Sequence, residues 1–171
     1  AQVTSDVFLG DYTNLNDLRR TVTGADVMTF DHEHVPTEHL TTLIAEGVNA
    51  QPQPTALVNA QDKLVMRQHL AALGAPVPRF VAIESVADIE AFWRQVDGEV
   101  CLKARRGGYD GHGVWFPKSE GECVELVTRL LDAGMLLMAE QKVRLVRELS
   151  AMVARTPSGA TQPWPGVESV Q

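Results

Sequence analysis

The spacing of apolar residues changes several times along the chain, and each change predicts an element. Apolar residues recur at helical spacing in five segments, which predicts helices over 14–23, 37–46, 59–73, 86–97 and 119–133. Pro36 and Ser85 are expected where the second and fourth helices begin. The third helix is expected to have Asn59 as its cap and to stop at Gly74.

Short apolar runs and alternating runs between these helices predict strands. The expected strands are one ending near residue 83, and others over 26–30, 99–104, 114–117, 135–141 and 147–156. The turn signal at 157–159 predicts that the last strand reverses direction. The segment 47–58 contains two prolines and little periodicity, so it is expected to be a connection. The fold class is therefore α/β, with an α+β character from about residue 76, and the expected parts are 1–75 and 76–171.

Composition limits the kinds of partner. The chain has 171 residues, of which 44% are hydrophobic and 22% charged, and its net charge is -7. This acidic balance argues against general binding to nucleic acid or to anionic membranes. No apolar run approaches the roughly 20 residues of a membrane span. The two cysteines lack metal-ligand spacing, and Cys101 lies in an apolar run, so we expect a reduced core thiol and a cytoplasmic protein.

The most informative segment is 103–113, Lys-Ala-Arg-Arg-Gly-Gly-Tyr-Asp-Gly-His-Gly. Its glycines lie between two predicted strands, where backbone N–H groups can approach an anion closely. The spacing fits neither a P-loop nor a Rossmann fingerprint, and a loose hairpin connection is the simpler alternative. Lys103, near the end of an apolar strand, favours an anion, because a lysine there is costly unless it is paired or reaches solvent.

A metal site is a second hypothesis. In the run Asp31-His32-Glu33-His34, two imidazoles would share one face of a strand, with carboxylates nearby. The other histidines are scattered, and none supplies a third ligand at a recognisable spacing. The run would then make this a divalent-metal-binding domain.

Four segments together resemble ATP-grasp enzymes of the carboxyaminoimidazole ribonucleotide synthase type. They are TFDHEHVP (29–36), NAQDKLVMRQHLAALGAPVP (59–78), LKARRGGYDGHGVW (102–115) and AEQKVRLVRELSAMVARTPSG (139–159). The pattern Gly-Gly-Tyr-Asp-Gly-x-Gly is specific to this subfamily. The resemblance implies the tail of a Rossmann-like pre-ATP-grasp domain with a linker helix over 1–75, and the first part of an ATP-grasp domain over 76–171.

The resemblance also implies residue roles. Lys63 and Lys103 would meet the ATP phosphates, 107–113 would close over them, 140–143 would contact the adenine, and Glu148 the ribose. The implied ATP-binding residues are Lys63, Lys103, Gly107, Gly108, Gly111, Gly113, Glu140, Gln141, Lys142, Val143 and Glu148. The implied substrate-binding residues are Glu33, Tyr109 and Asp110. No catalytic residue and no metal ligand is assigned.

The activity implied is ATP-dependent carboxylation of 5-aminoimidazole ribonucleotide with bicarbonate, in purine biosynthesis, by a C–N ligase that forms ADP and phosphate. Its cofactors would be ATP and magnesium, and the whole enzyme would be a homodimer. The chain begins without methionine and ends in a strand-like run, so we expect a piece truncated at both ends and inactive alone. The magnesium ligands would lie beyond Gln171. A non-catalytic interaction module on the same fold is a further alternative.

Overall fold

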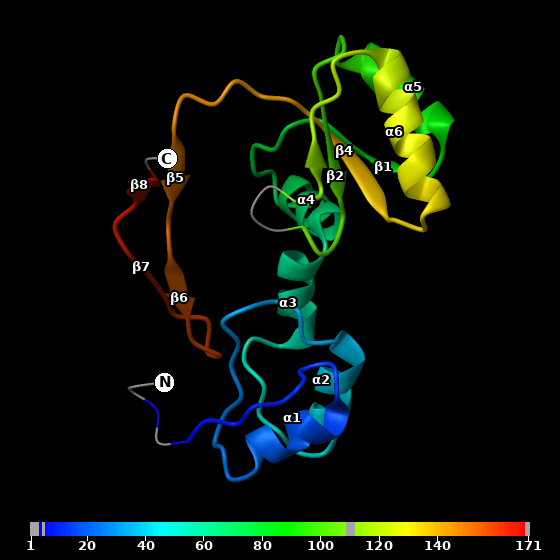
Figure 1. Cartoon of the computed structure of the whole chain (residues 1–171). Helices are drawn as coiled ribbons and strands as arrows, with labels where there is room; N and C mark the ends of the chain where they lie inside the picture. Colours follow the sequence, from blue (N-terminus) through cyan, green and yellow to red (C-terminus); the bar gives the residue numbers. More distant parts are fainter. Residues whose placement is uncertain (1–3, 5, 109–111, 170–171) are drawn as a thin grey trace. The chain divides into compact units, whose positions relative to one another are not determined.

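The structure is a computed structural model, and it describes residue 4 and residues 6–108 and 112–169. Figure 1 shows the elements along the chain. The helices are α1 (Leu15–Val22), α2 (Thr37–Ala45), α3 (Pro54–Gln61), α4 (Lys63–Ala72), α5 (Val86–Gln95) and α6 (Glu120–Asp132). The strands are β1 (Phe80–Ile83), β2 (Val100–Ala104), β3 (Val114–Trp115), β4 (Leu137–Gln141), β5 (Glu148–Ser150), β6 (Val153–Arg155), β7 (Thr161–Pro163) and β8 (Val167–Ser169).

Four strands of the first compact unit, residues 1–141, form one antiparallel sheet in the order β1-β4-β2-β3. Lys103 pairs with Met138 across β2 and β4, and Cys101 pairs with Glu140. Side chains alternate between the two faces of a sheet. Val100 and Leu102 therefore face one side, while Cys101 and Lys103 face the other.

Helices α5 and α6 lie together on one side of this sheet (Figure 1). The core between them is apolar, and each large side chain buried there contributes about 1.5–3 kcal/mol to folding. Its buried members are Ile83, Ile89, Phe92, Val96, Val100, Leu102, Cys123, Val127, Leu130, Leu137 and Ala139. A capping box between Ser85 and Asp88 starts α5. Because one face is filled this way, Lys103 and Glu140 are left on the opposite face.

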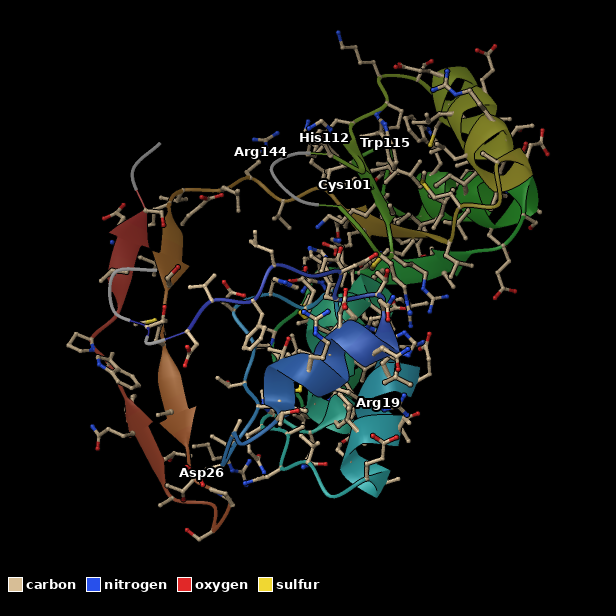
Figure 2. The ribbon with its side chains drawn as sticks, turned by 60° about the horizontal axis from the view of Figure 1, so that its bottom comes forward. Arg19, Asp26, Cys101, His112, Trp115 and Arg144 are labelled. Atoms are coloured by element: carbon tan, nitrogen blue, oxygen red, sulfur yellow. The ribbon has the colours of Figure 1, made fainter. Side chains whose placement is uncertain are left out.

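The predicted core position of Cys101 is confirmed, since this cysteine is buried and in no disulfide. Figure 2 labels it in the sheet region together with Trp115 of β3. Cys123 is also free and buried, and burial and the nearby carboxylates of Glu122 and Glu120 raise its pKa to about 11. The Cys123 thiol is therefore not activated as a nucleophile at neutral pH.

The segments before residue 62 pack a small core of their own. Its buried members are Leu18, Val35, Leu40, Leu43 and Leu57. The helices expected over 14–23 and 37–46 are confirmed. The strand expected over 26–30 is wrong: Met28 makes a single parallel bridge with Ala50. An apolar run becomes a strand only where a neighbouring strand accepts its hydrogen bonds, and the described residues extend that pairing no further.

The single helix predicted over 59–73 is wrong, because the chain makes two helices there. α3 begins at Pro54, inside the segment expected to be a connection, and α4 begins at Lys63. Asp62 separates them in an extended conformation and caps α4 by accepting hydrogen bonds from Leu64 and Val65. Asn59, the predicted cap, instead donates to the Thr55 and Ala56 carbonyls within α3.

The second compact unit, residues 142–171, consists of paired short strands. β5 pairs with β8, and β6 pairs with β7, both antiparallel. The strand expected over 147–156 is thus present in two pieces, and the turn predicted at 157–159 is confirmed, with Gly159 at a φ of 93°. None of the helices in the described part of the chain is long and apolar enough to cross a membrane.

Candidate functional site

The glycine-rich loop between β2 and β3 is closed at its base and crowded inside. The Ala104 amide donates to the Gly113 carbonyl at 2.8 Å. Gly107 and Gly113 have φ values of 72° and 73°, which favour glycine. A Cβ on Gly108 would lie 2.6 Å from the His112 carbonyl oxygen. These positions bring backbone close to backbone, which a simple hairpin turn does not require. Tyr109, Asp110 and Gly111 lie outside the described residues.

Gly108→Ala is expected to weaken nucleotide binding by about tenfold, because the added methyl forces the backbone near His112 to move. Gly121→Ala is the matched control. Gly121 lies on α6 with nothing within 4 Å of the added atom, so that change should be neutral or stabilising by up to about 1 kcal/mol. Calorimetric titration of the full-length protein with ATP compares the two. Equal affinities would show that the loop does not hold the nucleotide.

Lys63 joins the start of α4 to this loop. Its backbone N–H donates to the Arg105 carbonyl at 3.0 Å. Its ammonium donates to the Gly108 carbonyl at 3.4 Å. The ammonium has three hydrogens, so this contact leaves donors for a further acceptor. A cation is therefore placed beside the backbone of the loop.

Lys103 lies on β2, next to the base of the loop, and forms an ion pair with Glu140. Its ammonium is 3.1 Å from Glu140 Oε2. Arg67 of α4 also binds Glu140 in a bidentate way, with Nε to Oε1 at 3.0 Å and Nη2 to Oε2 at 3.2 Å. Glu140 is only 4% exposed. One buried carboxylate thus holds two cations from different elements on the sheet face opposite α5 and α6.

Asp62 is a second buried carboxylate, 1% exposed. Arg105 binds it with Nε to Oδ1 at 3.1 Å and Nη2 to Oδ2 at 2.7 Å. Arg106 Nε lies 3.3 Å from Oδ2. Burial raises the pKa of the Asp62 carboxyl, but hydrogen bonds from Arg105 and the Val65 amide help to outweigh burial, so this pKa lies below its ordinary value. The carboxylate is therefore ionised at neutral pH.

Acid is expected to remove the stabilisation that ionised Asp62 provides. Because folding lowers the pKa of this carboxyl, its contribution is complete above a pH of about 4 and is lost as the pH falls through the lower folded value. The unfolding free energy of the wild-type protein should therefore fall more steeply below about pH 4 than that of Asp62→Asn. Chemical denaturation of the full-length protein at several pH values measures both slopes. Parallel slopes would contradict the pairing of Asp62 with the two arginines.

A pocket of about 470 Å³ lies beside this cluster. It is lined by residues from the segment before α2, from the start of α2, from α3 and from the loop. The set includes Glu33, His34, Gln61, Arg106 and Gly107. The Gln61 side chain donates to the Glu33 carbonyl at 2.9 Å, which ties the first segment to α3. The residues that line the pocket therefore include the acidic Glu33 and Glu38 and the basic Arg106.

The segment with His32 and His34 does not form the expected strand face. Residues 31–33 and 35 are bends, and the His34 amide donates to His32 Nδ1 at 3.2 Å. The two rings are 5.2 Å apart, and Tyr12 packs against His32. The described residues contain no group of three or more histidine, cysteine, aspartate or glutamate side chains that could hold a metal ion. The strand geometry behind the metal hypothesis is wrong, and the described residues give that hypothesis no support.

The remaining predicted site residues fall on either side of the division between the units. Glu140 and Gln141 end β4, and the Gln141 amide donates to the Arg79 carbonyl at 2.8 Å. Lys142 and Val143 begin the second unit, where Val143 is half exposed, and Glu148 begins β5 opposite Ser169. The structure brings Lys63 to the loop and Lys103 to Glu140. It also places Glu33 and Gly107 on one pocket.

The sequence interpretation missed three side chains that organise this region: Asp62, Arg67 and Glu140 in its role as an ion-pair partner. An aspartate followed by Lys-Leu-Val is a recognisable helix start, so the cap at Asp62 could have been found. Its arginine partners lie 43 and 44 residues away, and no local pattern reveals them. Together, the glycine backbone and Lys63, Lys103, Arg105 and Arg106 provide amide and cationic donors suited to an anionic ligand with several phosphates.

The chain matches two family models. Residues 68–171 match the ATP-grasp domain, and residues 1–61 match the ribonucleotide synthetase preATP-grasp domain. The fold class expected from the sequence, a Rossmann-like tail followed by an ATP-grasp part, is thereby confirmed.

Several similar proteins are carboxyaminoimidazole ribonucleotide synthases. The N5-carboxyaminoimidazole ribonucleotide synthase of Corynebacterium ammoniagenes is 64% identical over all of this chain, which covers 41% of that protein. The structure of carboxyaminoimidazole ribonucleotide synthase from Aspergillus clavatus with ATP is 26% identical, with a TM-score of 0.84, over 99% of this chain and 44% of its own. Its complex with ADP and 5-aminoimidazole ribonucleotide is 25% identical, with a TM-score of 0.80, over 95% of this chain and 41% of its own. The chain thus spans about two fifths of the length of these relatives.

Proposed function

Since this chain belongs to the ATP-grasp family, we propose that it forms part of a ligase that carboxylates 5-aminoimidazole ribonucleotide with ATP and bicarbonate. The observation that carries the proposal is the pocket shared by Glu33 and the loop residues Arg106 and Gly107. A substrate held there lies beside the loop that is suited to phosphates. The sequence match to a synthase of this name over the entire chain supports the same activity.

The proposed reaction has two steps. A bicarbonate oxygen attacks the γ-phosphorus of ATP, the bond to the bridging oxygen breaks, and ADP leaves with carboxyphosphate formed. The substrate amine then attacks the carboxyl carbon, phosphate departs, and the nitrogen releases a proton to give a carbamate. The protein accelerates this by holding the triphosphate and excluding water from the labile anhydride.

The candidate residues of this chain bind different parts of the two substrates. Lys63 and Lys103 meet the phosphates, and the amides of Gly107, Gly108, Gly111 and Gly113 approach them. The segment from Glu140 through Gln141 and Lys142 to Val143 contacts the adenine, and Glu148 accepts hydrogen bonds from the ribose. Glu33, Tyr109 and Asp110 face the aminoimidazole ribonucleotide. These assignments follow the family resemblance, and the contacts of Lys63 with Gly108 and of Lys103 with Glu140 are compatible with them.

Further properties of the proposed enzyme rest on the family resemblance and on the sequence pattern. ATP-grasp ligases of this kind imply magnesium, and the described residues hold no acidic cluster that fits a metal ion. We also propose a homodimeric, cytoplasmic enzyme. Its pre-ATP-grasp part would extend through residue 75 and its ATP-grasp part would begin at residue 76.

An assay of ADP release from the full-length protein tests this proposal. ADP should form only when ATP, bicarbonate and 5-aminoimidazole ribonucleotide are all present, and omitting either of the last two should lower the rate by at least about tenfold. Lys63→Met should lower the rate with all three. If ADP forms at the same rate without the ribonucleotide, the protein is an ATPase and the ribonucleotide is not its substrate.

A further inference from the structure

The contacts of Asp62 exceed what a helix cap needs. The chain caps other helices with neutral side chains, Asn14 for α1, Ser85 for α5 and Ser119 for α6. A neutral oxygen satisfies the first amides of a helix as well as a carboxylate does. Asp62 caps α4 through Oδ1 alone, so its charge and its second oxygen serve another purpose.

That second purpose is to bind two consecutive arginines of the loop. Arg105 makes a bidentate contact that uses both carboxylate oxygens, and Arg106 binds Oδ2. A bidentate pair fixes the guanidinium plane as well as its position. The Arg105 carbonyl also accepts a hydrogen bond from the backbone N–H of Lys63. Residues 62–63 and 105–106 are thus joined by several contacts across more than 40 positions of sequence.

Arg106 links this cluster to the pocket. It is one of the residues that line the pocket with Glu33. Its side chain is 58% exposed even though its partner Asp62 is 1% exposed. Asp62 holds Arg106 by its Nε, so the guanidinium keeps its other N–H donors for a ligand in the pocket.

We infer that Asp62 is a positioning residue that sets Arg106 at the wall of the substrate pocket and Lys63 beside the glycine-rich loop. This inference rests on the proposed function. It adds Asp62 and Arg106 to the residues that are needed to bind ATP and the ribonucleotide. Asp62 itself touches neither substrate. It acts by joining the start of α4 to the loop, so that the cation for the phosphates and the cation of the pocket are placed by the same carboxylate.

Asp62→Asn separates this role from helix capping, because asparagine caps a helix equally well but lacks the charge that holds two guanidinium groups. In the full-length protein the dissociation constant of ATP and the KM of the ribonucleotide should each rise by about tenfold or more. Asp88→Asn is the matched control. Asp88 also accepts hydrogen bonds at a helix start, from Ser85, but contacts no arginine, so it should change Tm alone.

Arg106→Gln tests the inference from the partner side. Because the Arg106 side chain is 58% exposed, the variant should lose little stability and should raise the KM of the ribonucleotide. In a double-mutant cycle, Arg106→Gln should add little in the Asp62→Asn background, because the arginine is already misplaced there. Additive effects on KM, or Asp62→Asn behaving like Asp88→Asn, would overturn the inference. If the wild-type protein does not carboxylate the ribonucleotide, the proposed function is rejected. The ATP dissociation constants of the wild type, Asp62→Asn and Asp88→Asn would then still decide the role of Asp62.

Discussion

Lys103→Met is expected to weaken ATP binding by about 2–5 kcal/mol, which is roughly 30-fold or more, while the fold stays intact. The ammonium lies on β2 at the base of the glycine-rich loop and is 20% exposed. Its ion pair with Glu140 holds the ammonium at this place, and an ammonium has three N–H donors with which to meet an anion. Methionine has a similar length and fills the same space, so the sheet should survive the change.

Calorimetric titration with ATP measures this effect on the full-length protein. Lys118→Met is the matched control, because Lys118 is an exposed lysine beyond β3. That control should bind ATP as the wild type does. All three proteins should fold, although Lys103→Met loses the stabilisation that the ion pair with Glu140 provides. Unchanged ATP affinity in Lys103→Met would mean that the lysine only pairs with Glu140.

Glu140→Gln is expected to lower the unfolding free energy by about 2–4 kcal/mol. The carboxylate is 4% exposed and binds Arg67 and Lys103. Removing one partner of a buried ion pair leaves the other charges uncompensated, at a cost of about 3–5 kcal/mol in a fully buried setting. We expect less here because the two cations keep about a fifth of their side-chain surface exposed.

Denaturant unfolding of the full-length protein measures that loss as a lower midpoint with an unchanged slope. Glu84→Gln is the control, since Glu84 is exposed and should tolerate the change within about 0.5 kcal/mol. Equal midpoints for Glu140→Gln and Glu84→Gln would show that the two ion pairs of Glu140 contribute nothing to stability.

Local patterns predicted the sheet unit well for physical reasons. Ser85 is followed at the third position by Asp88, and both side chains make the capping box. The apolar runs at 99–104 and 135–141 became β2 and β4 because each finds a partner on the next strand. In these segments the local preference and the tertiary environment agree, which is where prediction from sequence is dependable.

Prediction failed where distant residues decide the structure. The 59–73 pattern has the period of one helix, but Asp62 turns its carboxylate toward Arg105 and Arg106, and the helix restarts there. Likewise, an acidic residue at the end of an apolar strand gave no sign that Glu140 binds Arg67, which lies 73 positions earlier. The family resemblance named candidate residues, whereas the ion pairs that hold them required the folded chain.

The formation of the new carbon–nitrogen bond is the most direct test of the proposed function. The full-length protein would be given ATP, 5-aminoimidazole ribonucleotide and ¹³C-labelled bicarbonate, and the carbon signal would be followed by NMR. A carbamate carbon bonded to the substrate nitrogen should appear, in step with one ADP per product, and should be lost when ATP is omitted. ADP formation without a labelled carbamate would contradict the assignment of this chain to a carboxylating ligase.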